Sequence, residues 1–177
     1  YTMDVYRGHI KAEKKFITYG LFVAFFPKLV AGPIQRAAEL IEQLKQRPSF
    51  RLEFVAEGLR RMLYGLFLKV VFADNIASFV DVGFAINPHD LAGLDVITLG
   101  FLFGFQVYFD FAAYSHIALG AAKVLGISIP ENFNFPYIAT SMKEFWKRWH
   151  ISLSSWIRDY LYLPLTGTKV LVSTGTG

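Results

Sequence analysis

The sequence predicts an all-α, multi-pass membrane protein made of short, tilted or re-entrant helices and one interfacial amphipathic helix. Of the 177 residues, 54% are hydrophobic and 18% are charged, and the mean hydropathy is positive. A soluble domain carries about 25% charged residues. Because apolar runs of helical length recur along the chain, we favour a membrane protein over a soluble protein with a buried helix.

The composition also excludes several functional classes. Cysteine is absent and no histidine pair has metal-ligand spacing, so we expect no disulfide scaffold and no metal site. The net charge of +4 is too small and too scattered for a nucleic-acid surface, whereas it suits basic loops at a membrane. No glycine-rich phosphate motif or nucleophile elbow is present. We therefore predict no bound cofactor and no nucleic-acid partner.

Charges, prolines and glycines divide the first half of the chain into short elements. None of these elements has the about 20 consecutive apolar residues that a straight membrane helix needs. The predicted elements are, in order, an amphipathic basic start (6–15), an apolar stretch (16–26), a break at Pro27 and Gly32-Pro33, a polar helix (35–45), a boundary (47–49) and a helix of mixed polarity (54–73).

The second half contains the most apolar segment. A loop over residues 87–90 precedes residues 91–109, which come closest to the length of a membrane span. Joining this run to residues 111–122 across Asp110 would give a longer segment. Residues 130–137 are too rich in Pro and Asn for a helix interior, and they predict a loop.

A helix with one aromatic face follows this loop. Ser141 and Glu144 have the spacing of a capping box, and Pro164 predicts the end of the helix at residue 163. At 100° per residue the apolar side chains fall within about 120° of arc. These side chains are Phe145, Trp146, Trp149, Leu153, Trp156, Ile157 and Tyr160. Basic residues beside three tryptophans are typical of a helix that lies at a membrane interface.

His150 falls on the border between the apolar and the polar face of this predicted helix. Burial and the neighbouring lysines are both expected to lower the pKa of its imidazole. A neutral imidazole is the form that accepts a proton from an attacking hydroxyl group. Helical geometry alone leaves the alternative open that His150 is a surface residue or a contact to a neighbouring helix.

Four stretches in the same order carry a resemblance to a known family. They are FFPKLVAGPI (25–34), FQVYFDF (105–111), PENFNFPY (130–137) and FWKRWHISLSSWIRDYLYLPL (145–165). The chain resembles the membrane-bound O-acyltransferases, and in particular the alginate O-acetyltransferase branch, which also includes the D-alanyl transfer protein of teichoic acid. One difference is His116, which follows Ser115 where family members often have aspartate.

The resemblance implies a larger fold whose centre is thinned by two funnels. We expect residues 1–177 to be an internal fragment of one transmembrane domain, truncated at both ends. His150 is similar in position to the first prominent histidine of the family. The histidine that usually has the catalytic role stands in a later Trp-His-Gly sequence, and it is expected beyond Gly177.

The resemblance also suggests roles for individual residues. His150 is expected to support or relay proton transfer. The expected substrate channel is lined by Trp146, Trp149, Trp156, Ser154, Arg158, Gln106 and Asn132. Asp110 is a secondary catalytic candidate. It shares a helix face with Gln106 and Tyr114, and a structural ion pair with an Arg or His of another helix is as good an explanation as a role in the reaction channel. Asn132 has the alternative of satisfying backbone groups of its loop.

The function implied is an O-acyltransferase of a cell-envelope polysaccharide in the bacterial inner membrane. An acyl group, expected to be acetyl, would pass from a cytoplasmic donor, either acetyl-CoA or an acyl-carrier thioester, to polymer hydroxyls. The expected partners are membrane lipid, a donor or carrier protein, and the polysaccharide or a downstream acetyltransferase. Two alternatives remain: a transport protein, and a scaffold subunit of an envelope-modification complex without chemistry of its own.

Overall fold

The structure is a computed structural model that describes residues 1–46 and 51–167, and every regular element in these ranges is helical. The all-α prediction is confirmed, and the predicted boundary at residues 47–49 lies outside the described residues. The helices are α1 (Thr2–Tyr6), α2 (Phe16–Ala24), α3 (Ala37–Gln46), α4 (Leu52–Phe67), α5 (Asp74–Ala85), α6 (Gly93–Val124), α7 (Met142–Arg148), α8 (Ile151–Ile157) and α9 (Leu163–Leu165).

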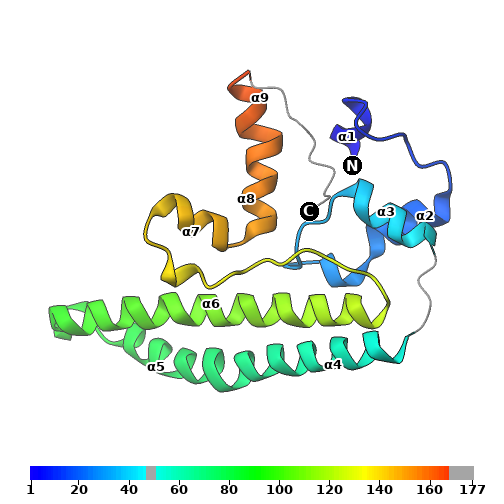
Figure 1. Ribbon diagram of the computed structural model, residues 1–177. Helices are drawn as coiled ribbons and strands as arrows, with labels where there is room; N and C mark the ends of the chain where they lie inside the picture. The colour runs from blue at the N-terminus through cyan, green and yellow to red at the C-terminus, as the bar shows by residue number, and fades with distance from the viewer. Residues whose placement is uncertain (47–50, 168–177) are drawn as a thin grey trace.

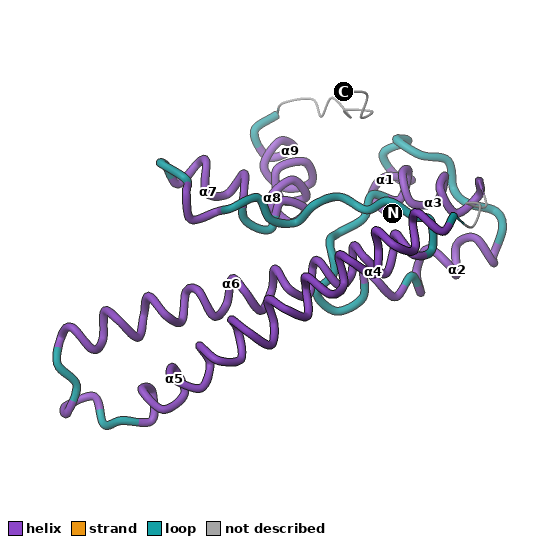
Figure 2. The backbone as a smooth tube through the Cα atoms, turned by 60° about the horizontal axis from the view of Figure 1, so that its bottom comes forward, coloured by secondary structure: helices purple, strands orange, loops and turns teal. Residues whose placement is uncertain are grey.

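Two long antiparallel helices form the base of the molecule (Figures 1 and 2). A π-helical segment, Leu68–Ala73, joins α4 to α5 without a break, which gives one helix over Leu52–Ala85. A short turn at Pro88–Asp90 leads into α6, which returns along α4. The predicted junction across Asp110 is confirmed, because α6 is continuous from Gly93 to Val124.

Glycines allow α4 and α6 to approach closely. A Cβ atom added to Gly58 would lie 2.6 Å from the carbonyl oxygen of Gly120, and one added to Gly65 would lie 2.7 Å from that of Ala113. Backbone contact through small residues is typical of helix pairs in membranes.

Both long helices have the length and composition of a membrane span. They contain 34 and 32 residues, and only 22% and 11% of the most apolar window of each is buried. The core helix of a soluble protein is mostly buried, so apolar side chains that face outward favour a lipid environment. The prediction that only residues 91–109 approach the length of a span was therefore wrong for Leu52–Ala85.

Internal ion pairs explain why charges do not interrupt these helices. Lys69 lies 2.6 Å from the carboxylate of Asp110 and 2.9 Å from that of Asp74. In the sequence each of these residues divides an apolar run. In the fold Lys69 compensates Asp110 across the hairpin and Asp74 along the same helix, which lowers the cost of placing charge in an apolar segment.

The N-terminal part packs over one end of the hairpin. Its core joins α2 and α3 to the C-terminal end of α6 through Phe22, Phe25, Ala37, Leu40, Ile41, Ala122 and Ile127. The predicted polar helix over 35–45 is confirmed as α3. The predicted amphipathic start over 6–15 was wrong, because α1 ends at Tyr6 and Gly8 turns the chain with a φ of +75°.

The predicted single helix over residues 141–163 is broken in the structure. Ser141 caps α7 by accepting a hydrogen bond of 3.2 Å from the N–H of Glu144, as the capping box predicts. The helix then stops at Arg148, and His150 has a left-handed φ of +43° before α8 starts. Trp146 thus lies on a different helix from Trp156.

The helix that begins at Ile151 continues past its predicted end. The segment Arg158–Tyr162 is π-helical, and it leads directly into α9. Pro164 stands in the first turn of α9, where a proline is tolerated. The prediction that Pro164 ends the helix at residue 163 was wrong, because the π-helical bonding has already shifted the pairing of donors and acceptors by one residue.

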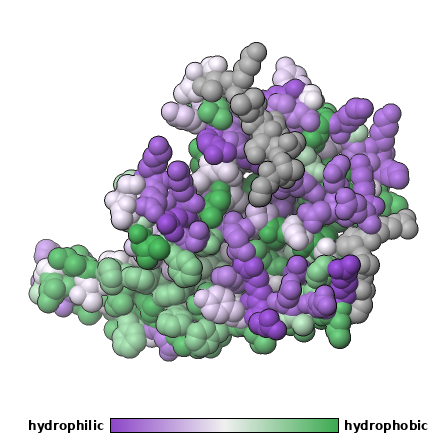
Figure 3. Space-filling view, in the orientation of Figure 1, coloured by the Kyte–Doolittle hydropathy of each residue, from purple (hydrophilic) through white to green (hydrophobic). Residues whose placement is uncertain are grey.

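The apolar and the polar parts of the surface lie over different helices. On the face shown in Figure 3, apolar side chains gather over α5 and the neighbouring part of α6, whereas polar side chains gather over the α7–α9 arm and α3. The α5 end of the hairpin is therefore the part best suited to lie in the membrane.

Candidate functional site

The candidate site is centred on His150, in the turn between α7 and α8. The extended segment over residues 132–134 runs beside this turn and binds the backbone on both sides of it. The N–H of Asn134 donates to the carbonyl of Arg148, and the N–H of Ile151 donates to the carbonyl of Asn132, both at 2.9 Å. These bonds hold the backbone at the helix break and compensate the cost of the left-handed conformation at His150.

A buried polar network fixes the start of α8. The side-chain oxygen of Asn132 accepts a hydrogen bond of 2.9 Å from the Ser152 hydroxyl, and its amide nitrogen donates to the Ser115 hydroxyl at 3.2 Å. Ser152 in turn accepts a bond of 3.0 Å from the N–H of Ile34. Asn132, Ser115 and Ser152 are 1%, 3% and 6% exposed. Asn132 is thus engaged in joining the loop, α6 and α8, and this geometry is that of a positioning residue.

The imidazole of His150 is half-buried beside an aromatic ring. It packs edge to face on Phe111 of α6, with the ring centroids 4.7 Å apart. Burial lowers the pKa of His150 below its ordinary value, so the neutral form predominates at neutral pH. Within the described residues no hydrogen bond of the imidazole is recorded, so a lone pair is available to accept a proton.

Aromatic rings form a wall on one side of this histidine. Trp149 lies edge to face with Phe133 at 5.2 Å and stacks on Phe145 at 5.6 Å, and Phe133 contacts Phe111 at 5.0 Å. Trp149 is the predicted channel residue that belongs to this wall. Trp146 lies on α7 and is 51% exposed. Among the described residues, its only ring contact with the wall is with Phe145.

The remaining predicted residues of α8 lie on the other side of the helix break. The hydroxyl of Ser154 donates to the carbonyl of Trp149 at 3.2 Å, and its N–H donates to the carbonyl of His150 at 3.0 Å. Trp156 stacks on Tyr160 at 5.4 Å. Arg158 lines a cavity of about 810 Å³ between α8, α3 and the N-terminal segment, together with Ser152 and Ser155 of α8. Ser154 thus bonds to the backbone of the histidine turn, whereas Trp156 and Arg158 face other partners farther along the helix.

The predicted polar face of α6 has a different set of partners. Asp110 pairs with Lys69, so its partner is a lysine and not the expected arginine or histidine. The Tyr114 hydroxyl donates to the carbonyl of Leu29 at 2.7 Å. The side-chain oxygen of Gln106 is buried without a hydrogen-bond partner among the described residues. The geometry therefore places Asp110 in the ion-pair set of the hairpin.

Sequence reasoning missed the buried hydroxyls and the phenyl ring beside the histidine. Ser152 lies inside the longest of the family-like stretches and Ser115 lies in an apolar helix, but only the fold shows that Asn132 joins them. A small polar residue in an apolar stretch was the available signal. Nothing in the sequence distinguished Phe111, because many phenylalanines stand near it in the chain. Among the described residues, no group of three or more His, Asp or Glu side chains could hold a metal ion.

Long apolar helices with a half-buried histidine at a helix break define an integral membrane protein with a candidate proton-accepting site. Residues 9–176 match the model of MBOAT, the membrane-bound O-acyltransferase family. The chain belongs to this family, and the family resemblance of the sequence is confirmed.

Relatives within the family differ in the polymer that their names specify. The chain is 43% identical over 169 residues to the probable alginate O-acetylase AlgI of Azotobacter vinelandii, covering 96% of this chain and 33% of that protein. It is 43% identical over 157 residues to the peptidoglycan O-acetyltransferase of Helicobacter pylori, covering 88% and 30%. It is 32% identical over 172 residues to the teichoic acid D-alanyltransferase of Bacillus subtilis, covering 91% and 41%. The chain spans about a third of the length of the first two relatives.

Proposed function

We propose that the intact protein is an O-acyltransferase of a bacterial cell-envelope polysaccharide. The family membership supports transfer of an acyl group to oxygen. The three relatives named above act, by their names, on alginate, peptidoglycan and teichoic acid. We take acetyl as the acyl group, since two of these three names specify it. The chain is proposed to be an internal part of one multi-pass domain in the inner membrane.

The observation that carries this proposal is the half-buried imidazole of His150, which lies at the helix break and packs on Phe111. In the reaction, a polymer hydroxyl attacks the carbonyl carbon of a thioester donor and forms a C–O bond. The hydroxyl proton passes to an imidazole nitrogen, the C–S bond breaks, and the departing thiolate takes up a proton. A neutral imidazole in partly apolar surroundings is suited to the proton-accepting step.

We assign His150 a supporting or relay role in this proton transfer. The principal histidine of the family is proposed to lie in the part of the protein outside this chain. Trp149 and its aromatic neighbours would exclude water from the acyl group, since a thioester in contact with water hydrolyses. The donor is proposed to be acetyl-CoA or an acyl-carrier thioester, and the acceptor the polysaccharide itself or a downstream acetyltransferase.

The experiment replaces His150 by Ala in the intact protein and measures acetylation of the polymer. Loss of a group that transfers a proton typically lowers the rate about 10²–10⁴-fold, so acetylation should nearly disappear. The matched control is His89→Ala, because His89 lies in the exposed turn before α6. That variant should acetylate normally.

Two other measurements separate a loss of catalysis from a loss of protein and from a loss of partner binding. The amount of His150→Ala protein in the membrane should equal that of the unmodified protein. Co-purification of partner proteins should also be unchanged, whereas a scaffold subunit without chemistry would lose its partners instead. Normal acetylation by His150→Ala would disprove the assigned role.

A further inference from the structure

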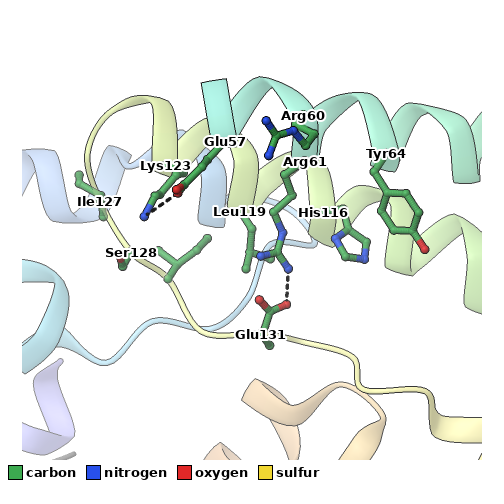
Figure 4. A pocket seen from close by; sticks show the side chains of 11 residues that line it. Glu57, Arg60, Arg61, Tyr64, His116, Leu119, Lys123, Ile127, Ser128 and Glu131 are labelled. Carbon is green, nitrogen blue, oxygen red and sulfur yellow. Dashed lines mark hydrogen bonds and ion pairs between the residues drawn. The ribbon is translucent and has the colours of Figure 1, made fainter. Parts of the chain in front are cut away.

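A second cavity, whose lining does not include the turn at His150, lies at the charged end of the hairpin. It has a volume of about 600 Å³, and it is bounded by α4, by the C-terminal part of α6 and by the segment over residues 127–131. Figure 4 shows Arg61 and Glu131 pointing toward each other across it, with Tyr64 and His116 side by side at one end. A cavity of this size is typical of small-molecule sites.

The charges that line the cavity do not balance. Glu57 lies 3.2 Å from the Lys123 ammonium group, and Glu131 pairs with Arg61. No ion pair or hydrogen bond of the Arg60 side chain is recorded in the described part of the chain. Three cations against two carboxylates leave one positive charge. Arg61 also has a buried Nε atom without a hydrogen-bond partner there, so donor capacity is unused. This arrangement favours a ligand with one negative charge.

The position of the cavity indicates what kind of anion this is. After Arg60 and Arg61, the next charge along the long helix is Lys69, so the arginines mark the boundary of its apolar part. Tyr64 and Phe67 follow Arg60 at helical spacing along one face, and each is 49% exposed. The face thus passes from a guanidinium group to exposed aromatic rings within about two turns. A molecule with an anionic head and an apolar tail matches this sequence of surfaces.

We propose that this cavity binds the phosphodiester headgroup of an anionic membrane lipid such as phosphatidylglycerol. The phosphate would neutralise the excess positive charge at Arg60 and Arg61, and the acyl chains would lie along Tyr64 and Phe67. A basic pocket between membrane helices at the surface of the bilayer has the chemistry that such headgroups require.

Binding is measured by native mass spectrometry on the intact protein in detergent, titrated with short-chain phosphatidylglycerol. Phosphatidylcholine with the same chains should bind about fivefold more weakly, because its choline group cancels the phosphate charge. Arg60→Gln should weaken phosphatidylglycerol binding by a similar factor, and Arg60→Lys should retain it. Lys14→Gln is the matched control, since it removes one positive charge from an exposed loop away from the cavity.

Glu131→Gln makes the test independent of misfolding. Removal of this carboxylate frees Arg61 from its internal partner, so phosphatidylglycerol should bind about fivefold more tightly. A general loss of structure would weaken binding in every variant. The proposal is overturned if Arg60→Gln binds as tightly as the unmodified protein, or if Glu131→Gln binds more weakly. It is also overturned if inorganic phosphate or coenzyme A displaces the lipid, which would indicate a site for a soluble phosphate.

Discussion

At the scale of single residues, the site depends on a left-handed histidine that its neighbours hold in place. A left-handed conformation costs a residue with a side chain about 1–2 kcal/mol. At His150 the compensating groups are the backbone of residues 132–134 and the Asn132 side chain, which bonds to the first turn of α8. The functional side chain and the side chain that positions it are therefore different residues, far apart in the sequence.

Asn132→Ala tests this positioning role. It leaves the Ser152 and Ser115 hydroxyls without their side-chain partner, and a buried polar group without a partner costs about 1–3 kcal/mol. We expect polymer acetylation to fall about tenfold or more, because a helix start that shifts moves the imidazole away from the reacting atoms. The matched control is Asn134→Ala. Asn134 is exposed and contributes a backbone N–H, which the substitution retains.

The pH profile distinguishes positioning from a general loss of stability. A histidine that relays the proton must be neutral to accept it, so activity should fall as the pH drops through the pKa of His150. Burial lowers this pKa, and the unmodified protein should stay active below pH of about 6.5, the ordinary value for histidine. If Asn132→Ala admits water to the imidazole, the acid limb should move up toward that value. An unchanged acid limb with less folded protein would contradict the positioning role.

At the scale of elements, the sequence predicts where helices form better than it predicts where they are interrupted. The 3.6-residue pattern over residues 141–163 is regular, yet the chain leaves the helix at His150. The reason is a contact with residues 132–134, which compete for the backbone at Arg148 and Ile151. A helical pattern contains no information about a partner that arrives from another part of the chain. The same limit applies to Lys69, which divides the apolar pattern but is neutralised by Asp110.

The packing of α4 on α6 gives a prediction for a single glycine. In Gly58→Ala the new Cβ atom would lie 2.6 Å from both the Gly120 carbonyl oxygen and a methyl carbon of Val124. The helices must move apart, and overpacking of this kind costs about 1–3 kcal/mol. We expect a lower thermal unfolding temperature for the intact protein in detergent.

A glycine elsewhere in the hairpin serves as the control, because its replacement should not lower the unfolding temperature. A Cβ atom added to Gly100 of α6 would have no neighbour within 4 Å, so Gly100→Ala adds helix propensity without a clash. Its unfolding temperature should stay the same or rise. An equal decrease in both variants would show that close approach of the helices at Gly58 is not required.

At the scale of the whole molecule, exposed apolar side chains outnumber buried ones along the hairpin. The described residues bury a core between α2, α3 and the end of α6, but Phe79, Ile97 and Phe101 are 70%, 70% and 66% exposed. Such a surface is stable only against lipid or against other apolar helices. A larger membrane domain would supply both environments, which supports the proposal that the chain is an internal part of such a domain.

Phe101→Arg tests this organisation. An arginine near the centre of a membrane helix costs about 2.5–3.5 kcal/mol on insertion scales, so the amount of intact protein in the membrane should fall severalfold. Phe101→Leu keeps the side chain apolar and should insert normally. On the surface of a soluble protein the same arginine would change stability by about 0.5 kcal/mol or less. Equal membrane yields for the two variants would mean that α6 faces water at Phe101, and the bilayer could not then be the solvent of the hairpin.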